Sequence, residues 1–140
     1  DDFSQSGQDQ FAYNLSGFHG LYLEIGAHDP IINSNTFNLE IKCRWKGISI
    51  EKDKSFKKAW DIASNRKNEI IWDDAFNIDY SKLIKDKNFP YRLDYLSCDI
   101  EPAENTFNIL RKISNVNRVD VIIFFMLKSY QLVWLIGNPF

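Results

Sequence analysis

Five apolar or β-branched runs recur along the chain at nearly equal intervals, and this rhythm constrains the fold more than any other feature. The runs cover residues 20–25, 47–50, 69–72, 95–100 and 119–125. Each of the first four ends near an acidic residue, and these four markers are 27, 22 and 26 residues apart: Glu24, Glu51, Asp73 and Asp99. One strand, one helix and two short loops occupy about that length. The spacing therefore predicts a βα repeat.

The segments between the runs have the apolar periodicity of helices. Apolar side chains recur at helical spacing over residues 34–45 and again over residues 56–63, where Asp53 precedes the first turn as a cap. A third helix is predicted after residue 102, with one apolar stripe made of Phe107, Leu110 and Ser114. The strands are too apolar to have a polar face. We therefore expect an α/β fold with a Rossmann-like parallel sheet and helices on both faces.

The composition indicates one ordinary globular domain. The 140 residues are 44% apolar and 26% charged, and no linker or low-complexity tract divides them. We expect a single domain with a helical lead-in over residues 1–19, a βα core over 20–125 and a divergent tail over 126–140. The net charge of −2 offers no electrostatic footprint for nucleic acid or for an anionic membrane surface, so neither is expected as a partner.

Cysteine usage and the chain's first residues indicate a reducing compartment. Cys43 and Cys98 lie far apart, without a Cys-x-x-Cys spacing or a neighbouring histidine cluster, which argues against a disulfide framework and a zinc site. Residues 1–10 are polar and lack the apolar core of a signal peptide. The apolar run over 121–136 is interrupted by Lys128 and too short for a membrane span. We expect a cytoplasmic protein without a metal site.

The residues that follow each run are the candidates for a ligand site, because open α/β sheets bind ligands at the carboxyl ends of their strands. Gly26, in the turn after the first run, would allow a ligand to approach the backbone closely. Glu51 has the position and the chemistry to accept hydrogen bonds from both hydroxyls of a ribose. Asp74 is placed to touch an adenine edge. The turn lacks the dinucleotide pattern Gly-x-Gly-x-x-Gly, and acidic residues without a balancing Arg favour S-adenosylmethionine over a diphosphate.

Five stretches in chain order carry a family resemblance. They are residues 4–9 (SQSGQD), 22–30 (YLEIGAHDP), 34–36 with 39–40 (SNT, LE), 45–51 (WKGISIE) and 94–101 (DYLSCDIE). Together they resemble the FkbM-like family of S-adenosylmethionine-dependent methyltransferases. The resemblance implies a class I methyltransferase fold, with a seven-stranded sheet whose last strand is antiparallel. It also implies methyl transfer to a hydroxyl oxygen of a sugar or a small natural product.

The resemblance also implies roles for individual residues. Glu24 and Gly26, with Ala27 beside them, would line the methionine end of the cofactor. Glu51 would bind the ribose, Asp74 the adenine, and Asp99 would face the cofactor and the reacting centre. His28 is a second catalytic candidate, since a histidine can accept a proton near neutral pH. A solvated loop histidine and a helix-capping Asp99 are the plainer alternatives.

The chain departs from the family pattern after Val121. The family's next strand would end in an acidic, histidine-bearing tip, whereas this chain reads IIFFML over residues 122–127. We expect a truncated or altered C-terminus, with C-terminal strands missing and the strand over 119–125 left as an exposed apolar edge. Two other functions stay open: a non-catalytic fragment that binds the cofactor weakly or not at all, and a nicotinamide dehydrogenase that uses Glu51 without the glycine-rich turn. The oligomeric state is open as well.

Overall fold

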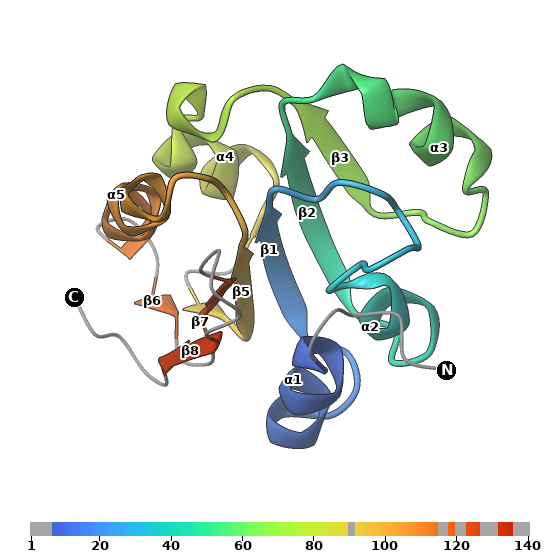
Figure 1. The fold of residues 1–140 in the computed structure, drawn as a ribbon. Coiled ribbons are helices and arrows are strands. Elements are labelled where there is room, and N and C mark those ends of the chain that lie inside the picture. The colour runs from blue at the N-terminus through green and yellow to red at the C-terminus, as the bar shows by residue number, and fades with distance from the viewer. Residues whose placement is uncertain (1–6, 90–91, 115–117, 120–122, 127–131, 136–140) are drawn as a thin grey trace.

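The computed structural model describes residues 7–89, 92–114, 118–119, 123–126 and 132–135. Within these residues, strands alternate with helices as the rhythm of the sequence predicts, and helices lie on both sides of a central sheet (Figure 1). The α/β, Rossmann-like prediction is confirmed. The motif at residues 4–9 lies mostly outside the described residues.

Six strands form the central sheet, in the order β3-β2-β1-β5-β7-β8. Their bounds are β1 Leu21–Ile25, β2 Lys46–Glu51, β3 Glu69–Trp72, β5 Tyr95–Cys98, β7 Ile123–Met126 and β8 Leu132–Leu135. The first five strands of this list are parallel, and β8 is antiparallel to β7. The order reverses between β1 and β5, and this reversal is where α/β sheets place their ligand sites.

Helices cover both faces of the sheet. Their bounds are α1 Gln8–Ser16, α2 Phe37–Ile41, α3 Lys57–Ile62, α4 Tyr80–Asp86 and α5 Ala103–Ser114, with 3-10 turns η1 Lys54–Phe56 and η2 Ala75–Asn77. Successive residues of a strand point to opposite faces. Tyr22 of β1 therefore packs with Leu39 of α2 on one face, whereas Leu23 belongs to the core that includes Tyr80 of α4 and Ile109 of α5 on the other.

Of two predictions about the helices, one is confirmed and one needs correction. The predicted cap at Asp53 is confirmed, because its carboxylate accepts the backbone N–H of Ser55 at 3.0 Å. The helix expected over 34–45 is shorter, since α2 ends at Ile41 and the chain turns through Arg44, whose φ is 59°, before Trp45 enters the core.

The stripe predicted for the last helix is correct at Leu110, which is 1% exposed, and wrong at Phe107. Phe107 is 38% exposed, whereas α5 buries Thr106, Ile109, Leu110 and Ile113. These positions recur at the helical spacing i, i+3, i+4 and i+7, one residue out of phase with the predicted stripe. The side chain of the third predicted member, Ser114, lies outside the described residues.

The expected exposed edge at the fifth strand is also wrong. β8 pairs antiparallel with β7 over four residue pairs, from Ile123 with Leu135 to Met126 with Leu132, so β7 has a neighbour on each side. The sheet thus has six strands in the described residues, with an antiparallel last strand as the resemblance implies. A separate parallel ladder joins β4 (Arg92–Leu93) to β6 (Arg118–Val119) and was not predicted. None of the described helices is long and apolar enough to cross a membrane.

Candidate ligand-binding cleft

A cleft of about 610 Å³ opens at the carboxyl ends of β1, β2, β3 and β5, around the reversal of strand order. Six acidic side chains line it: Glu51, Asp53, Asp73, Asp74, Asp99 and Glu101. Among the described residues, its basic lining is limited to Lys52 and His28. Most of the predicted site residues thus meet here, because parallel strands bring their carboxyl ends to one edge.

A smaller cavity of about 240 Å³ adjoins the cleft and holds the remaining predicted residues. Glu24 and Ala27 line it, while Gly26, His28 and Asp99 line both spaces. These three shared residues lie between the cleft and the smaller cavity, near the carboxyl ends of β1 and β5. Every residue predicted for the site therefore lies in one connected region.

Glu51, the predicted ribose ligand, is held by the backbone of two different loops. Its Oε2 accepts the N–H of His28 at 2.9 Å, and its Oε1 accepts the N–H of Asp53 at 2.8 Å. Only 4% of the residue is exposed. A carboxylate offers about four acceptor positions, so both oxygens keep a free lone pair for a ligand while their orientation is fixed.

Gly26 is required by the packing of β1 against β5. Its φ is 78°, and a Cβ placed on it would lie 2.1 Å from the carbonyl oxygen of Asp99. The N–H of Asp99 donates to the carbonyl of Ile25 at 2.9 Å across the same contact. Gly26 is predicted to let a ligand approach the backbone closely. In the structure it also lets the end of the neighbouring strand β5 approach closely.

His28 is fixed through its backbone, while its ring lies at the cleft. Its φ is 52°, its N–H donates to Glu51, and its carbonyl accepts the indole N–H of Trp60 at 2.7 Å. The imidazole stacks on Phe56 with ring centroids 5.6 Å apart, and its Nε2 lies 4.0 Å from Glu51 Oε2. Its side chain is 55% exposed. The imidazole ring is therefore more than half exposed, and a ligand in the cleft can reach it.

Asp99 lies between the two spaces and has the electrostatics of a proton acceptor. Burial raises its pKa, Glu101 and Glu51 raise it further, and His28 opposes the shift. A carboxyl group with a raised pKa holds a proton more readily than an ordinary aspartate. Asp99 is therefore a candidate to exchange a proton with a bound hydroxyl.

Asp74, the predicted adenine ligand, is the N-cap residue of η2. Its Oδ1 accepts the N–H of Phe76 at 2.9 Å, and its own N–H donates to Asp73 at 2.7 Å. The neighbouring Asp53 also caps its own turn, and the hydrogen bonds from Ser55 lower its pKa. These carboxylates line the cleft and stabilise the turns at its rim at the same time.

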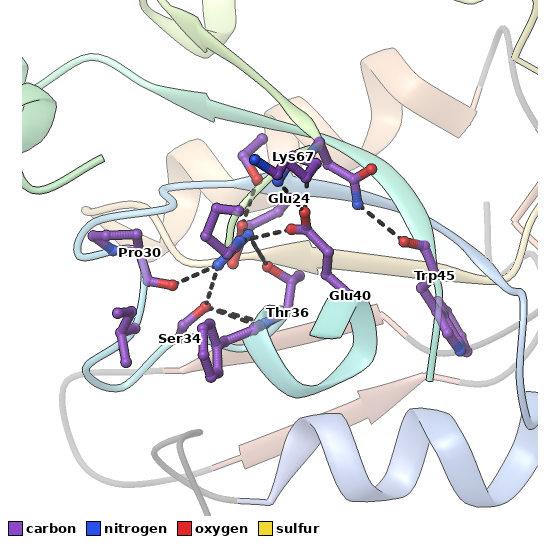
Figure 2. Close-up of polar contacts among 12 residues, drawn as sticks. Glu24, Pro30, Ser34, Thr36, Glu40, Trp45 and Lys67 are labelled. Carbon is purple, nitrogen blue, oxygen red and sulfur yellow. Dashed lines mark hydrogen bonds and ion pairs between the residues drawn. The ribbon is translucent and has the colours of Figure 1, made fainter. Parts of the chain in front are cut away.

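Glu24 belongs to a buried polar network that the sequence analysis did not foresee. Its Oε2 accepts hydrogen bonds from Thr36 Oγ1 at 2.9 Å and Ser49 Oγ at 2.6 Å, and the residue is 1% exposed. Burial raises its pKa, and the nearby Arg66 opposes that shift. Figure 2 shows Glu24, Thr36 and Glu40 turned toward the same region.

Arg66 is the residue that the sequence analysis missed. It lies in the loop between α3 and β3, and its side chain is 1% exposed. Its position after a helix that begins with two exposed lysines gave no signal of burial, and its partners Glu40 and Thr36 are 26 and 30 residues away. Only the fold brings these groups together.

The described residues contain no group of three or more His, Cys, Asp or Glu side chains arranged to hold a metal ion. Cys43 and Cys98 are both free thiols in the structure; Cys98 is buried and Cys43 is partly exposed. Burial raises the pKa of Cys98 to about 12, so this thiol is poorly suited to act as a nucleophile.

Comparison with known proteins supports the architecture. No protein-family model matches the chain, and no curated protein matches it. Among solved structures, the crystal structure of EvdMO1 is similar, with a TM-score of 0.56 and 14% sequence identity over 84% of this chain. The chain spans 28% of the length of that protein. At this identity the likeness shows the fold alone, and membership of the FkbM-like family stays a prediction from the sequence motifs.

Proposed function

We propose that the protein is an S-adenosylmethionine-dependent methyltransferase that transfers a methyl group to a hydroxyl oxygen of a sugar or small natural product. The observation that carries the proposal is the charge of the cleft: six carboxylates against one lysine and one histidine, at the strand ends where α/β sheets bind ligands. S-adenosylmethionine brings a sulfonium and an ammonium group into such a site, and each is attracted by the surrounding carboxylates.

The same charge argues against a nicotinamide dinucleotide. A diphosphate bound here would face Glu51, Asp53 and Asp99, and like charges at short range disfavour binding. Gly26 is followed by Ala27 and His28, so the turn also lacks the second glycine that a pyrophosphate needs for close approach. The cleft thus favours a ligand with a cationic or neutral tail.

In this proposal the cofactor, when bound, supplies an activated methyl group, and the protein supplies positioning and a proton acceptor. Glu51 would hold the ribose hydroxyls and Asp74 would face the adenine, each with its carboxylate already fixed by backbone N–H groups. Asp99 would orient the acceptor hydroxyl and accept its proton, with His28 as the second candidate for that role. Because positive charge is lost in the transfer, orientation and exclusion of water contribute most to the rate.

The alternative is a protein that binds the cofactor weakly or not at all and catalyses nothing. The divergent segment over 126–140 favours it, because the acidic strand tip that the resemblance implies is replaced by apolar residues. Cofactor affinity separates the two possibilities directly.

The test is calorimetric titration with S-adenosylhomocysteine of the wild type and of two variants that remove the same unit of charge. Glu51→Gln replaces the buried carboxylate, whereas Glu101→Gln replaces an exposed one at the rim. We expect Glu51→Gln to lose affinity by about tenfold or more, because one fixed acceptor is lost, and Glu101→Gln to stay close to the wild type.

Each of three results would contradict a part of the proposal. Unchanged affinity in a folded Glu51→Gln protein would show that the ribose assignment is wrong. Displacement of S-adenosylhomocysteine by a nicotinamide dinucleotide at similar concentration would favour the dehydrogenase. An absence of binding to a folded wild-type protein would favour the non-catalytic alternative.

A further inference from the structure

Arg66 lies behind the cleft and contacts the loop that forms one of its walls. Its guanidinium donates to the carbonyl of Pro30, to Ser34 Oγ at 3.2 Å and to Thr36 Oγ1 at 3.0 Å. Figure 2 shows Pro30, Ser34 and Thr36 arranged around one point with Glu40 opposite them. Arg66 itself lines neither the cleft nor the adjoining cavity.

We infer that Arg66 is a positioning residue for the cofactor site: it fixes the loop after β1 and the carboxylate of Glu24 from behind, without touching the ligand. This inference rests on the proposed function. Two chains of contact connect it to predicted site residues. One runs through Thr36, which donates to Glu24, and the other through Trp60, which lies under the guanidinium at 4.6 Å and donates to the carbonyl of His28.

The wall loop (residues 28–36) is tied to the core at several points, among them the N–H of His28, which donates to Glu51, and Nδ2 of Asn35, which donates to Ser97 Oγ at 3.3 Å. Asp29 Oδ1 accepts the N–H groups of Ile31 and Ile32, so the loop closes on itself at its tip. Ile32 is 68% exposed and contributes little packing there. The carbonyl of Pro30 and the hydroxyl of Ser34, by contrast, are tied to the core by Arg66. A rigid fork of donors suits this task, because an arginine can bind several acceptors in fixed directions.

Arg66 also acts on the charge of Glu24. The groups that face Glu24 are Arg66 from the loop before β3, His28 from its own loop, Tyr22 and Tyr95 from β1 and β5, and the hydroxyls of Thr36 and Ser49. Burial raises the pKa of Glu24, and among the groups that oppose this rise Arg66 has the largest effect. Without this cation, the pKa of Glu24 would be raised further, and Glu24 would hold its proton to a higher pH.

The experiment measures affinity for S-adenosylhomocysteine against pH in the wild type, Arg66→Gln, Arg66→Lys and Glu40→Gln. Glu40→Gln is the matched control: it breaks the Arg66–Glu40 ion pair, whose atoms are 2.6 Å apart, yet leaves the contacts to Pro30, Ser34 and Thr36 in place. Circular dichroism and urea unfolding identify conditions in which every variant is folded.

We expect both Arg66 variants to bind about tenfold more weakly than the wild type, as is typical when a supporting group behind a binding site is removed. Affinity should decrease as the pH is lowered and Glu24 becomes protonated. In Arg66→Gln this decrease should begin at a higher pH, because Glu24 then protonates more readily. Arg66→Lys keeps the cation and should keep the wild-type pH profile. If Arg66→Gln does not fold, Arg66→Lys carries the test through its weaker binding at an unchanged profile.

Three results would overturn the inference. The first is wild-type affinity for S-adenosylhomocysteine in folded Arg66→Lys and Arg66→Gln. The second is a loss of affinity in Glu40→Gln as large as that in the Arg66 variants, which would indicate general destabilisation. If the wild type does not bind S-adenosylhomocysteine, the proposed function fails, and hydrogen exchange of residues 28–36 tests the positioning role alone. Faster exchange in Arg66→Lys than in Glu40→Gln would support that role, and equal exchange, the third result, would contradict it.

Discussion

Replacing Gly26 with alanine tests whether the contact between the ends of β1 and β5 fixes the floor of the cleft. A Cβ at this position would lie 2.1 Å from the carbonyl oxygen of Asp99, an atom of the backbone that no side-chain rotation can remove. The positive φ of 78° adds about 1–2 kcal/mol of strain for a residue with a Cβ. Overpacking of a close contact adds about 1–3 kcal/mol. The free energy of unfolding should therefore fall by about 2–5 kcal/mol.

Gly7→Ala is the matched control, because Gly7 has a similar φ of 71° but would place no heavy atom within 4 Å of a new Cβ. Its expected loss is about 1–2 kcal/mol from backbone strain alone. Urea unfolding, followed by circular dichroism, measures both variants under the same conditions. If the two substitutions destabilise the protein equally, the close approach to Asp99 contributes nothing and the reasoning is wrong.

Two further predictions concern charge in the cleft. Burial raises the folded-state pKa of Asp99, so the folded protein binds this proton up to a higher pH than the unfolded chain, and the contribution of Asp99 to stability falls as pH rises above about 3.9. The stability of Asp99→Asn relative to the wild type should therefore increase over that range in urea unfolding, and its turnover should fall while cofactor affinity is kept. S-adenosylmethionine, which carries the sulfonium charge, should lose more affinity than S-adenosylhomocysteine between about 0.05 and 0.5 M salt in calorimetric titration, and equal salt dependence would count against electrostatic recognition.

The sheet was predictable because its strands are continuous apolar runs with regular spacing. The run over residues 69–72 coincides with β3, and those ending in Ile25 and Ile50 match β1 and β2 to within a residue. Acidic residues after these runs were correctly placed at one edge, because a parallel sheet collects the carboxyl ends of its strands there. Local sequence patterns were therefore sufficient to predict the α/β architecture and the position of the cleft.

The contacts that support the site were not predictable, because they depend on pairs distant in sequence. Arg66 reads as one more basic residue after a lysine-rich helix, yet the fold buries it against Glu40 and Thr36. The pairing of β8 with β7 is likewise set by a neighbouring strand and not by the run over 119–125 alone. The phase of the α5 stripe differed by one residue because Thr106, a polar residue, occupies a buried position through its hydrogen bond to the carbonyl of Ile100.

The carboxylates at the cleft divide into two kinds, and the division favours one chemical role for each. Glu51 accepts backbone N–H groups of two loops and Asp74 accepts one of its own turn, so their oxygens are oriented before any ligand arrives. Preorganised acceptors need little further ordering on binding and therefore favour affinity and specificity. Asp99 differs, because burial and its acidic neighbours raise its pKa. In the proposed function, the first kind would therefore bind the cofactor and Asp99 would accept the proton.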